Sequence, residues 1–504
     1  MSRGTRGTTT RVRRRRVRAP RRWVALALLA AAVAAGAAAW ALISTAGDDS
    51  GASAAEVHRF HSLPGLDPDA VTVAVAAHRT APGYVFLAVK RGAGQDGPQI
   101  VDDQGHVVWF HPAPAGMAAT GFRVQRYRGQ RVLTWWQGHT HNGHGLGEYV
   151  IVDDHYRRIA TVHAGNGHRG DHHEFQLTDH GTAYLTAYVP RKMDLTAVGG
   201  PRDGMIYESV LQEVNVATGR VVWEWRSADH VPVTEGMTPP KSDRPHDYFH
   251  LNAIDVDRDG NLLLSGRNVH AIYKINRRTG AIMWRLGGRR SDFRFGPGAR
   301  FAFQHDVQRR DDGTISLFDN EATPPQADQS RGLVLHVDER HRTATLVRAY
   351  THPDKLLVGA EGNVQTLPDG HVFMSWGAAG HVTEMSRRGR LLLDLRLPPG
   401  SDTYQAYRYP WHGEPLTRPA LAARRGTGER ITAWASWNGA TAVRSWQALA
   451  GDDPNALAPL GSPVPRTNFE TTIPARTTAR YVAVQALDAD GQVLATSRAI
   501  EPVR

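Results

Sequence analysis

The sequence has no cysteine among its 504 residues. Thiolate metal ligands and a cysteine nucleophile are therefore excluded, and any catalytic chemistry must use other side chains. Stretches with the 3.6-residue period of an amphipathic helix are scarce between residues 83 and 399, where short alternating runs end at glycine-containing turns. The chain is thus expected to be an all-β protein.

Acidic residues are absent from residues 1–22, which contain ten arginines. The formal net charge of the whole chain is +11, but the rest of the chain has 50 basic and 49 acidic side chains. The part after this tail is therefore almost neutral, and the composition does not support nucleic-acid binding. Residues 1–22 are interpreted as a basic cytoplasmic tail.

An uncharged run follows directly, from Trp23 to Ser44. As a helix it is long enough to cross about 30 Å of hydrocarbon, and arginines on its N-terminal side tend to stay in the cytoplasm. We expect a single-pass transmembrane anchor; a cleaved signal peptide and twin-arginine export, suggested by Arg21 and Arg22, are the alternatives. Each alternative places the folded part outside the cytoplasm, after a stalk and lead-in at residues 45–80.

Residues 81–410 contain repeated units of short strands and turns. One phrase, a glycine turn and a strand ending in tryptophan, occurs at residues 104–109, 218–223 and 279–284, and another, a strand followed by an Asp/Gly turn, at residues 175–181, 252–260, 306–313 and 364–370. About six such units predict a six-bladed β-propeller. Five or seven blades are the alternatives, because the unit from Tyr84 to Phe110 is incomplete and needs strands from elsewhere.

The pattern changes in residues 411–504. Alternating strands surround Trp434, Trp446 and Tyr481, with turns at Asn438-Gly439 and at residues 488–491. About 90 residues of this kind predict a small β-sandwich of the fibronectin type III or immunoglobulin-like class. None of its motifs suggests catalysis, so we expect it to pack against or extend the propeller.

Residues 246–313 have the richest functional pattern. His250, Arg267 and His305 each lie where an apolar, alternating run begins or ends. Strand ends on a rigid sheet are suitable positions for side chains that must converge on one space. Asp247 and Asp171 closely precede histidines and are candidates for orienting imidazole rings.

The combination of motifs resembles the bacterial arylsulfotransferase family, over about residues 80–400. The motifs are D-Y-F-H-L-N, L-L-S-G-R, T-G-x-I-x-W-R-L-G-G, D-H-H-E-F and F-Q-H-D-V, with W-N-G-A-T in the C-terminal part. The resemblance implies a six-bladed propeller that transfers a sulfuryl group from one phenol to another. It assigns the catalytic residues as His305, His250, Arg267 and His173.

The resemblance also implies a role for each residue. His305 would be the nucleophile, because a neutral imidazole forms a transient S–N bond that a second phenol breaks. Arg267 and His250 would bind the sulfuryl oxygens, and His173 would stabilise oxygen charge or transfer a proton. The expected partners are small phenols and aryl sulfates, with no cofactor, no metal and no nucleotide sulfate donor.

Three other functions compete with this one. The histidine-rich stretches at residues 139–144 and 168–173 have the composition of metal ligands, although loop histidines are usually only polar surface residues. The tryptophan phrase also resembles the blades of quinoprotein dehydrogenases, but these predict eight blades and a cofactor-bound cation. A non-catalytic binding propeller needs no intact His/Arg set, and the intact set argues against it.

Overall fold

The computed structural model describes Met1 and residues 56–504, with 48% strand and 4% helix. The protein is all-β, as predicted. The basic tail and the apolar run at residues 23–44 lie outside the described residues, so the transmembrane anchor stays a prediction. Among the described residues, no helix combines the length and the apolar character needed to cross a membrane. The short helices are α2 (Ser227–His230), η1 (Thr196–Val198), η2 (Val233–Glu235), η3 (Arg267–Val269) and η4 (Gly377–Ala379).

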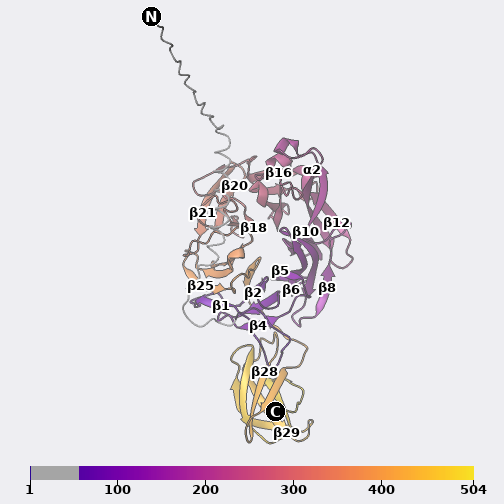
Figure 1. The fold of residues 1–504 in the computed structure, drawn as a ribbon, viewed down its shortest axis with the longest axis vertical. Helices are drawn as coiled ribbons and strands as arrows, with labels where there is room; N and C mark the ends of the chain where they lie inside the picture. The colour runs from indigo at the N-terminus through magenta and orange to yellow at the C-terminus, as the bar shows by residue number, and fades with distance from the viewer. Residues whose placement is uncertain (2–55) are drawn as a thin grey trace. The chain divides into compact units, whose positions relative to one another are not determined.

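Residues 72–409 form six β-sheets of four or five strands each (Figure 1). The first sheet contains β5 (Ala118–Tyr127), β6 (Gln130–His141), β7 (His144–Val152) and β8 (Arg158–Val162). The second contains β9 (Phe175–Leu177), β10 (Thr182–Met193), β11 (Gly204–Asn215) and β12 (Val221–Arg226). The third contains β13 (Leu251–Val256), β14 (Leu262–Gly266), β15 (Ala271–Ile275) and β16 (Ile282–Gly287).

The other three sheets complete the set. The fourth contains β17 (Arg294–Phe295), β18 (His305–Arg309), β19 (Ile315–Asp319), β20 (Arg331–Asp338) and β21 (Thr343–Tyr350). The fifth contains β22 (Asn363–Thr366), β23 (Val372–Ser375), β24 (His381–Met385), β25 (Leu391–Arg396) and the early strand β1 (Thr72–Val75). The sixth contains β2 (Tyr84–Val89), β3 (Gly97–Val101), β4 (Val107–Phe110) and the late strand β26 (Ala406–Tyr409). Among the strands of residues 56–504, all pairs are antiparallel except β17 with β21.

The six sheets follow one another around a closed ring (Figure 1). Strand β5 contacts β9, β10 contacts β13, β13 contacts β18, β18 contacts β22, β22 contacts β26, and β26 contacts β5 again. A ring of this kind leaves no long open sheet edge at its centre. The architecture is propeller-like, in agreement with the repeats in the sequence.

The two repeated sequence phrases occupy equivalent places in the sheets. The tryptophan phrases form the outermost strands β4, β12 and β16. The phrases with an Asp/Gly turn form the innermost strands β9, β13, β18 and β22. Trp109 and Trp284 are almost fully buried and pack against residues of the following sheet. The repeated tryptophan therefore contributes apolar area to the contact between neighbouring sheets.

The sixth sheet closes the ring with strands from both ends of the ring-forming segment. Strand β26 pairs with β2 from Tyr84 opposite Tyr409 to Leu87 opposite Ala406. Arg408 on β26 is buried and forms ion pairs with Asp103 (2.6 Å) and Glu384 (2.8 Å). The incomplete unit at residues 84–110 thus receives its innermost strand from elsewhere in the chain, as the sequence required.

A chain that ends at Gly400 should fail to unfold cooperatively, because it lacks β26. Tyr407 on this strand is 2% exposed, and truncation of one buried aromatic side chain typically costs about 3–5 kcal/mol. A chain that ends at Pro410 is the matched control, since it lacks the same C-terminal region but keeps β26. Thermal unfolding followed by circular dichroism compares them, and equal melting temperatures would contradict this account of closure.

Residues 420–496 form two further sheets. One contains β27 (Ala420–Arg425), β28 (Arg430–Ser436) and β31 (Glu470–Arg476), and the other contains β29 (Ser445–Gly451), β30 (Ala458–Pro465), β32 (Tyr481–Leu487) and β33 (Val493–Thr496). Trp446, Ile473 and Val484 pack together in a core between the two sheets. The Asn438 side chain accepts a hydrogen bond from the Phe110 N–H (3.0 Å) and donates one to its carbonyl (2.8 Å), which ties this region to β4.

Candidate active site

The sequence-predicted residues meet at the beginnings of the innermost strands of three consecutive sheets. His173 lies just before β9, His250 just before β13, and His305 is the first residue of β18. Arg267 follows β14 directly and begins η3. All three histidines are at least nine-tenths buried. Each of these three successive sheets thus places one imidazole in a common buried space.

His173 and His250 face each other through their Nε2 atoms, which lie 3.1 Å apart. The Nδ1 atom of His173 contacts Asp171 at 2.5 Å, and that of His250 contacts Asp247 at 2.5 Å. The two aspartates therefore orient the imidazoles, as the sequence suggested.

The charge state of this pair follows from the aspartates. Burial would raise the pKa of Asp171 and of Asp247, but the adjacent histidines hold both well below the usual value. Each aspartate is thus a carboxylate that only accepts hydrogen bonds, so each Nδ1 carries a proton. The Nε2···Nε2 contact is a hydrogen bond only when one of the two nitrogens is also protonated. An extra proton on the pair would therefore lie between the two rings, where it is available for transfer.

His305 has the tautomer that a nucleophile needs. Its Nδ1 lies 2.7 Å from Oδ1 of Asn320, whose amide nitrogen donates to the carbonyls of Val358 (3.1 Å) and Glu361 (2.9 Å). These two contacts fix the amide with its oxygen toward His305, so Nδ1 is the protonated ring nitrogen. The Glu361 N–H donates to Nε2 at 3.3 Å. The Nε2 atom therefore carries the lone pair.

Electrostatics keeps His305 neutral. Burial, followed by the nearby positive charge of Arg267, holds the pKa of His305 well below its usual value. Burial likewise lowers the pKa of His250 to about 4, although Asp247 opposes this shift. An unprotonated imidazole is a competent nucleophile at neutral pH once its Nε2 lone pair is released from the Glu361 N–H.

Arg267 supplies the positive charge beside His305. Its guanidinium donates to the carbonyl of Gly359 (2.8 Å) and to the side chain of Asn268 (2.8 Å), and it lies 4.9 Å from the Phe303 ring centroid. The carbonyl and the stacked ring hold the planar group in place without neutralising it by a carboxylate. The guanidinium is suited to binding an anion.

Two tyrosines that the sequence analysis did not select enclose the histidines. Tyr188 lies 5.6 Å from the ring of His173 and 5.7 Å from that of His250, and Tyr404 lies 5.6 Å from His173 and 6.2 Å from His305. Both hydroxyls donate to backbone carbonyls, of Leu251 and Asn252. Burial raises the pKa of both tyrosines well above the usual value. They therefore act as neutral walls of the site.

Some histidines of the two histidine-rich stretches lie at the surface, and others lie in the site. His139 and His141 are exposed at the end of the β6–β7 hairpin, whereas His144 is buried, with Nε2 3.1 Å from Asp247. Burial acts to lower the pKa of His144, but the hydrogen bond and the charge of Asp247 raise it overall. His172 is also buried and stacks on His173 at 4.2 Å. His144 and His172 therefore belong to the site.

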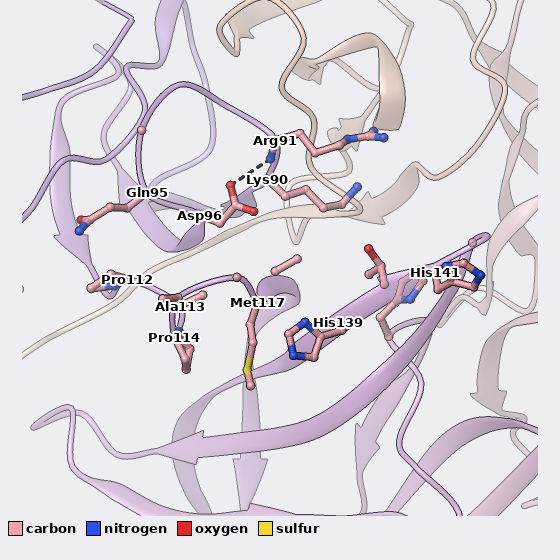
Figure 2. A pocket seen from close by; sticks show the side chains of 18 of the residues that line it. Lys90, Arg91, Gln95, Asp96, Pro112, Ala113, Pro114, Met117, His139 and His141 are labelled. Atoms are coloured by element: carbon pink, nitrogen blue, oxygen red, sulfur yellow. Dashed lines mark hydrogen bonds between the residues drawn. The ribbon is translucent and has the colours of Figure 1, made fainter.

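Two cavities flank the end of the β6–β7 hairpin. The large cavity has a volume of about 910 Å³ and reaches Lys90, His172 and Glu361. Figure 2 shows its wall, with Met117 and the prolines of residues 112–114 opposite Lys90 and Asp96. The basic cavity has a volume of about 220 Å³ and reaches His144, Asp247 and Arg267. Both cavities thus lead from the surface to residues of the histidine cluster.

The model of one protein family matches residues 123–397, and its description is arylsulfotransferase (ASST). The match covers more than half of the sequence and contains His173, His250, Arg267 and His305. The chain belongs to the arylsulfotransferase family. The family resemblance inferred from the motifs is confirmed. A comparison with curated proteins finds no match.

Solved structures similar to this arylsulfotransferase-family protein are distant. A protein of unknown function from Bacteroides caccae is 13% identical, with a TM-score of 0.39, over 63% of this chain and 94% of that one. An inactive variant of virginiamycin B lyase from Staphylococcus aureus with quinupristin is 8% identical, with a TM-score of 0.35, over 73% and 97%. Regucalcin, a calcium-binding protein from Agrobacterium tumefaciens, is 14% identical, with a TM-score of 0.32, over 64% and 83%.

The sequence contained only part of the signal for the remaining site residues. Asn320 directly follows the apolar strand β19, and His305 is the first residue of β18. Its position at a strand end could therefore have identified Asn320 as a site residue. Tyr404 and Glu361 lie in loops without a distinctive motif. The arylsulfotransferase-family site thus combines predictable strand-end residues with loop residues that only the closed ring brings near them.

Proposed function

We propose that this arylsulfotransferase-family protein transfers a sulfuryl group from an aryl sulfate to a phenolic acceptor through a covalent intermediate on His305. The observation that carries the proposal is the geometry of His305: Asn320 fixes its Nδ1–H, and its Nε2 lone pair lies in a buried site beside Arg267. No nucleotide sulfate donor is required, because the reaction exchanges one phenol for another.

The reaction consists of two balanced steps. In the first, the Nε2 lone pair of His305 forms a bond to sulfur, the S–O(aryl) bond breaks, and the departing phenolate takes the proton held by the His173/His250 pair. In the second, the acceptor phenol returns a proton to that pair while its oxygen attacks sulfur, and the S–N bond breaks. Arg267 stabilises the negative charge on the sulfuryl oxygens, while His250 acts through the proton that it shares with His173.

We also propose finer descriptions of the two structural regions. The six sheets are the blades of a six-bladed β-propeller, supported by the closed ring of contacts and by the pairing of β26 with β2. The two C-terminal sheets form a β-sandwich of the fibronectin type III kind, supported by their shared core around Trp446. The second region positions no residue of the histidine cluster.

Incubation of the full-length chain with 4-nitrophenyl sulfate and a phenol should yield nitrophenolate and the sulfated phenol in equal amounts. The expected acceptor dependence arises because only an acceptor completes the second step. Absorbance and mass spectrometry measure the two products, with omission of the acceptor as the control. Failure to transfer from a panel of aryl sulfates would contradict the proposed function.

Replacement of Asn320 by alanine should lower kcat by about 10- to 100-fold, the range typical of a lost orienting partner. Without the amide oxygen, His305 can adopt the tautomer with its proton on Nε2. Asn320→Asp should instead move the acid limb of kcat/KM to higher pH, because a carboxylate beside Nδ1 stabilises the imidazolium and raises the pKa of His305. An unchanged pH profile in Asn320→Asp with normal melting temperature would reject this positioning role.

A further inference from the structure

The lining of the basic cavity has an excess of positive charge. Lys241, Arg244 and Arg267 all line it, whereas Asp247 is its one acidic residue. Asp247 already accepts contacts from His144 (3.1 Å) and His250 (2.5 Å). Its charge is therefore shared with two imidazoles, and the cavity as a whole attracts anions.

The cationic side chains lie at two different depths. Arg267 belongs to the site, while Lys241 and Arg244 are exposed residues of the segment between η2 and β13. Arg244 is paired with Asp243 at 2.6 Å. Lys241 has no ion-pair partner among residues 56–504. The cavity thus has one guanidinium at its inner end and one unpaired ammonium at its outer end.

Flat rings and prolines line the cavity between these ends. Tyr207 packs on His144 with ring centroids 4.4 Å apart, and Pro239 and Pro245 also contribute. A volume of about 220 Å³ is smaller than the roughly 300–1,000 Å³ of sites for drug-sized ligands. A ligand with a single aromatic ring matches this space better than a fused or multi-ring compound.

His144 lines the same cavity and has one ring nitrogen without a partner among residues 56–504. Its Nδ1 is buried and has no hydrogen-bond partner in the described part of the chain. Burial acts to lower the pKa of this histidine, but the hydrogen bond and the charge of Asp247 raise it overall; its imidazolium form carries an N–H at Nδ1. Buried polar atoms are rarely unpaired, so this N–H points to a ligand that brings an acceptor.

We propose that the basic cavity selects aryl sulfates with one ring and a second anionic group, such as a ring carboxylate, opposite the sulfate ester. Arg267 receives the sulfuryl end, and Lys241 receives the second anion at the outer end. His144 donates to the ligand from the wall. This inference names the substrate class of the proposed function and rests on it for the sulfuryl end.

Kinetics with two matched donors tests the selectivity. With the full-length chain, kcat/KM for 4-carboxyphenyl sulfate should exceed that for phenyl sulfate by about tenfold, the ratio that corresponds to 1.4 kcal/mol. Lys241→Glu should bring the ratio of the two donors to one or below. Arg388→Glu, a charge reversal at an exposed turn outside the cavity, should leave the ratio unchanged. A ratio near one in the unmodified chain would overturn the proposal.

A binding measurement separates the cavity from the chemistry. Isothermal calorimetry with 4-(sulfomethyl)benzoate and with phenylmethanesulfonate, which cannot transfer a sulfuryl group, should show about tenfold tighter binding of the carboxylated compound. Lys241→Glu should remove that preference. A preference in binding without any transfer would refute the proposed function and support the cavity; transfer with equal or undetectable binding of both compounds would refute the cavity alone.

Discussion

The His305→Ala protein should release no burst of phenol and should have no measurable turnover. The unmodified chain, mixed with an aryl sulfate and no acceptor, should release about one phenol per active site, because each His305 accepts one sulfuryl group. His173 and His250 cannot replace it, since they face each other through their Nε2 atoms. Rapid-mixing absorbance measures the burst, and mass spectrometry locates the added sulfuryl group.

His180→Ala is the matched control for this experiment. His180 is exposed in the turn before β10, and its side chain has no hydrogen bond among the described residues. The control should keep both the burst and the label on His305. Full turnover in His305→Ala, or a burst with the label on another residue, would exclude His305 as the nucleophile.

The Arg267→Lys protein should lose about 100-fold or more in kcat/KM while it keeps its melting temperature. The guanidinium presents paired N–H groups to the sulfuryl oxygens, and an ammonium offers a point charge without that geometry. Loss of one such donor to a developing negative charge typically costs about 10²–10³ in rate. Steady-state kinetics with an aryl sulfate donor measures the change.

Arg278→Lys provides the comparison, because Arg278 is exposed in the turn before β16. It should retain the kcat/KM of the unmodified chain. A loss of less than tenfold in Arg267→Lys would show that positive charge alone suffices at this position, and the paired hydrogen bonds would then have no role in the transition state.

Much of the ring could be predicted from the sequence because its units repeat. The tryptophan phrases ending at Trp109, Trp223 and Trp284 fall on outermost strands, and the phrases with Asp/Gly turns begin on innermost ones. Local turn chemistry and strand alternation determine these features. The pairing of β26 with β2 joins residues more than 300 positions apart, and no local pattern specifies that partner.

The site shows the same division. His173, His250 and His305 could be selected because each stands at a strand start in a recognisable motif. His144 was grouped with His139 and His141, yet it turns inward to Asp247 while the other two remain exposed. Its environment comes from Tyr207, which belongs to the second sheet, and from Asp247, which lies in the loop before the third. Composition alone could not separate the three histidines.

The sixth sheet combines the early strands β2 to β4 with the late strand β26, so it can be completed only near the end of synthesis of the ring. The four proposed catalytic residues, Asn320 and Glu361 all precede β26 in the chain, so they are made before the ring can close. Strands β2 to β4 are synthesised early and lack their innermost partner until some 300 further residues have been added. At about 5–20 residues per second this delay lasts tens of seconds. During that time the incomplete sheet has an open edge, and a chaperone could bind there until residues 406–409 appear.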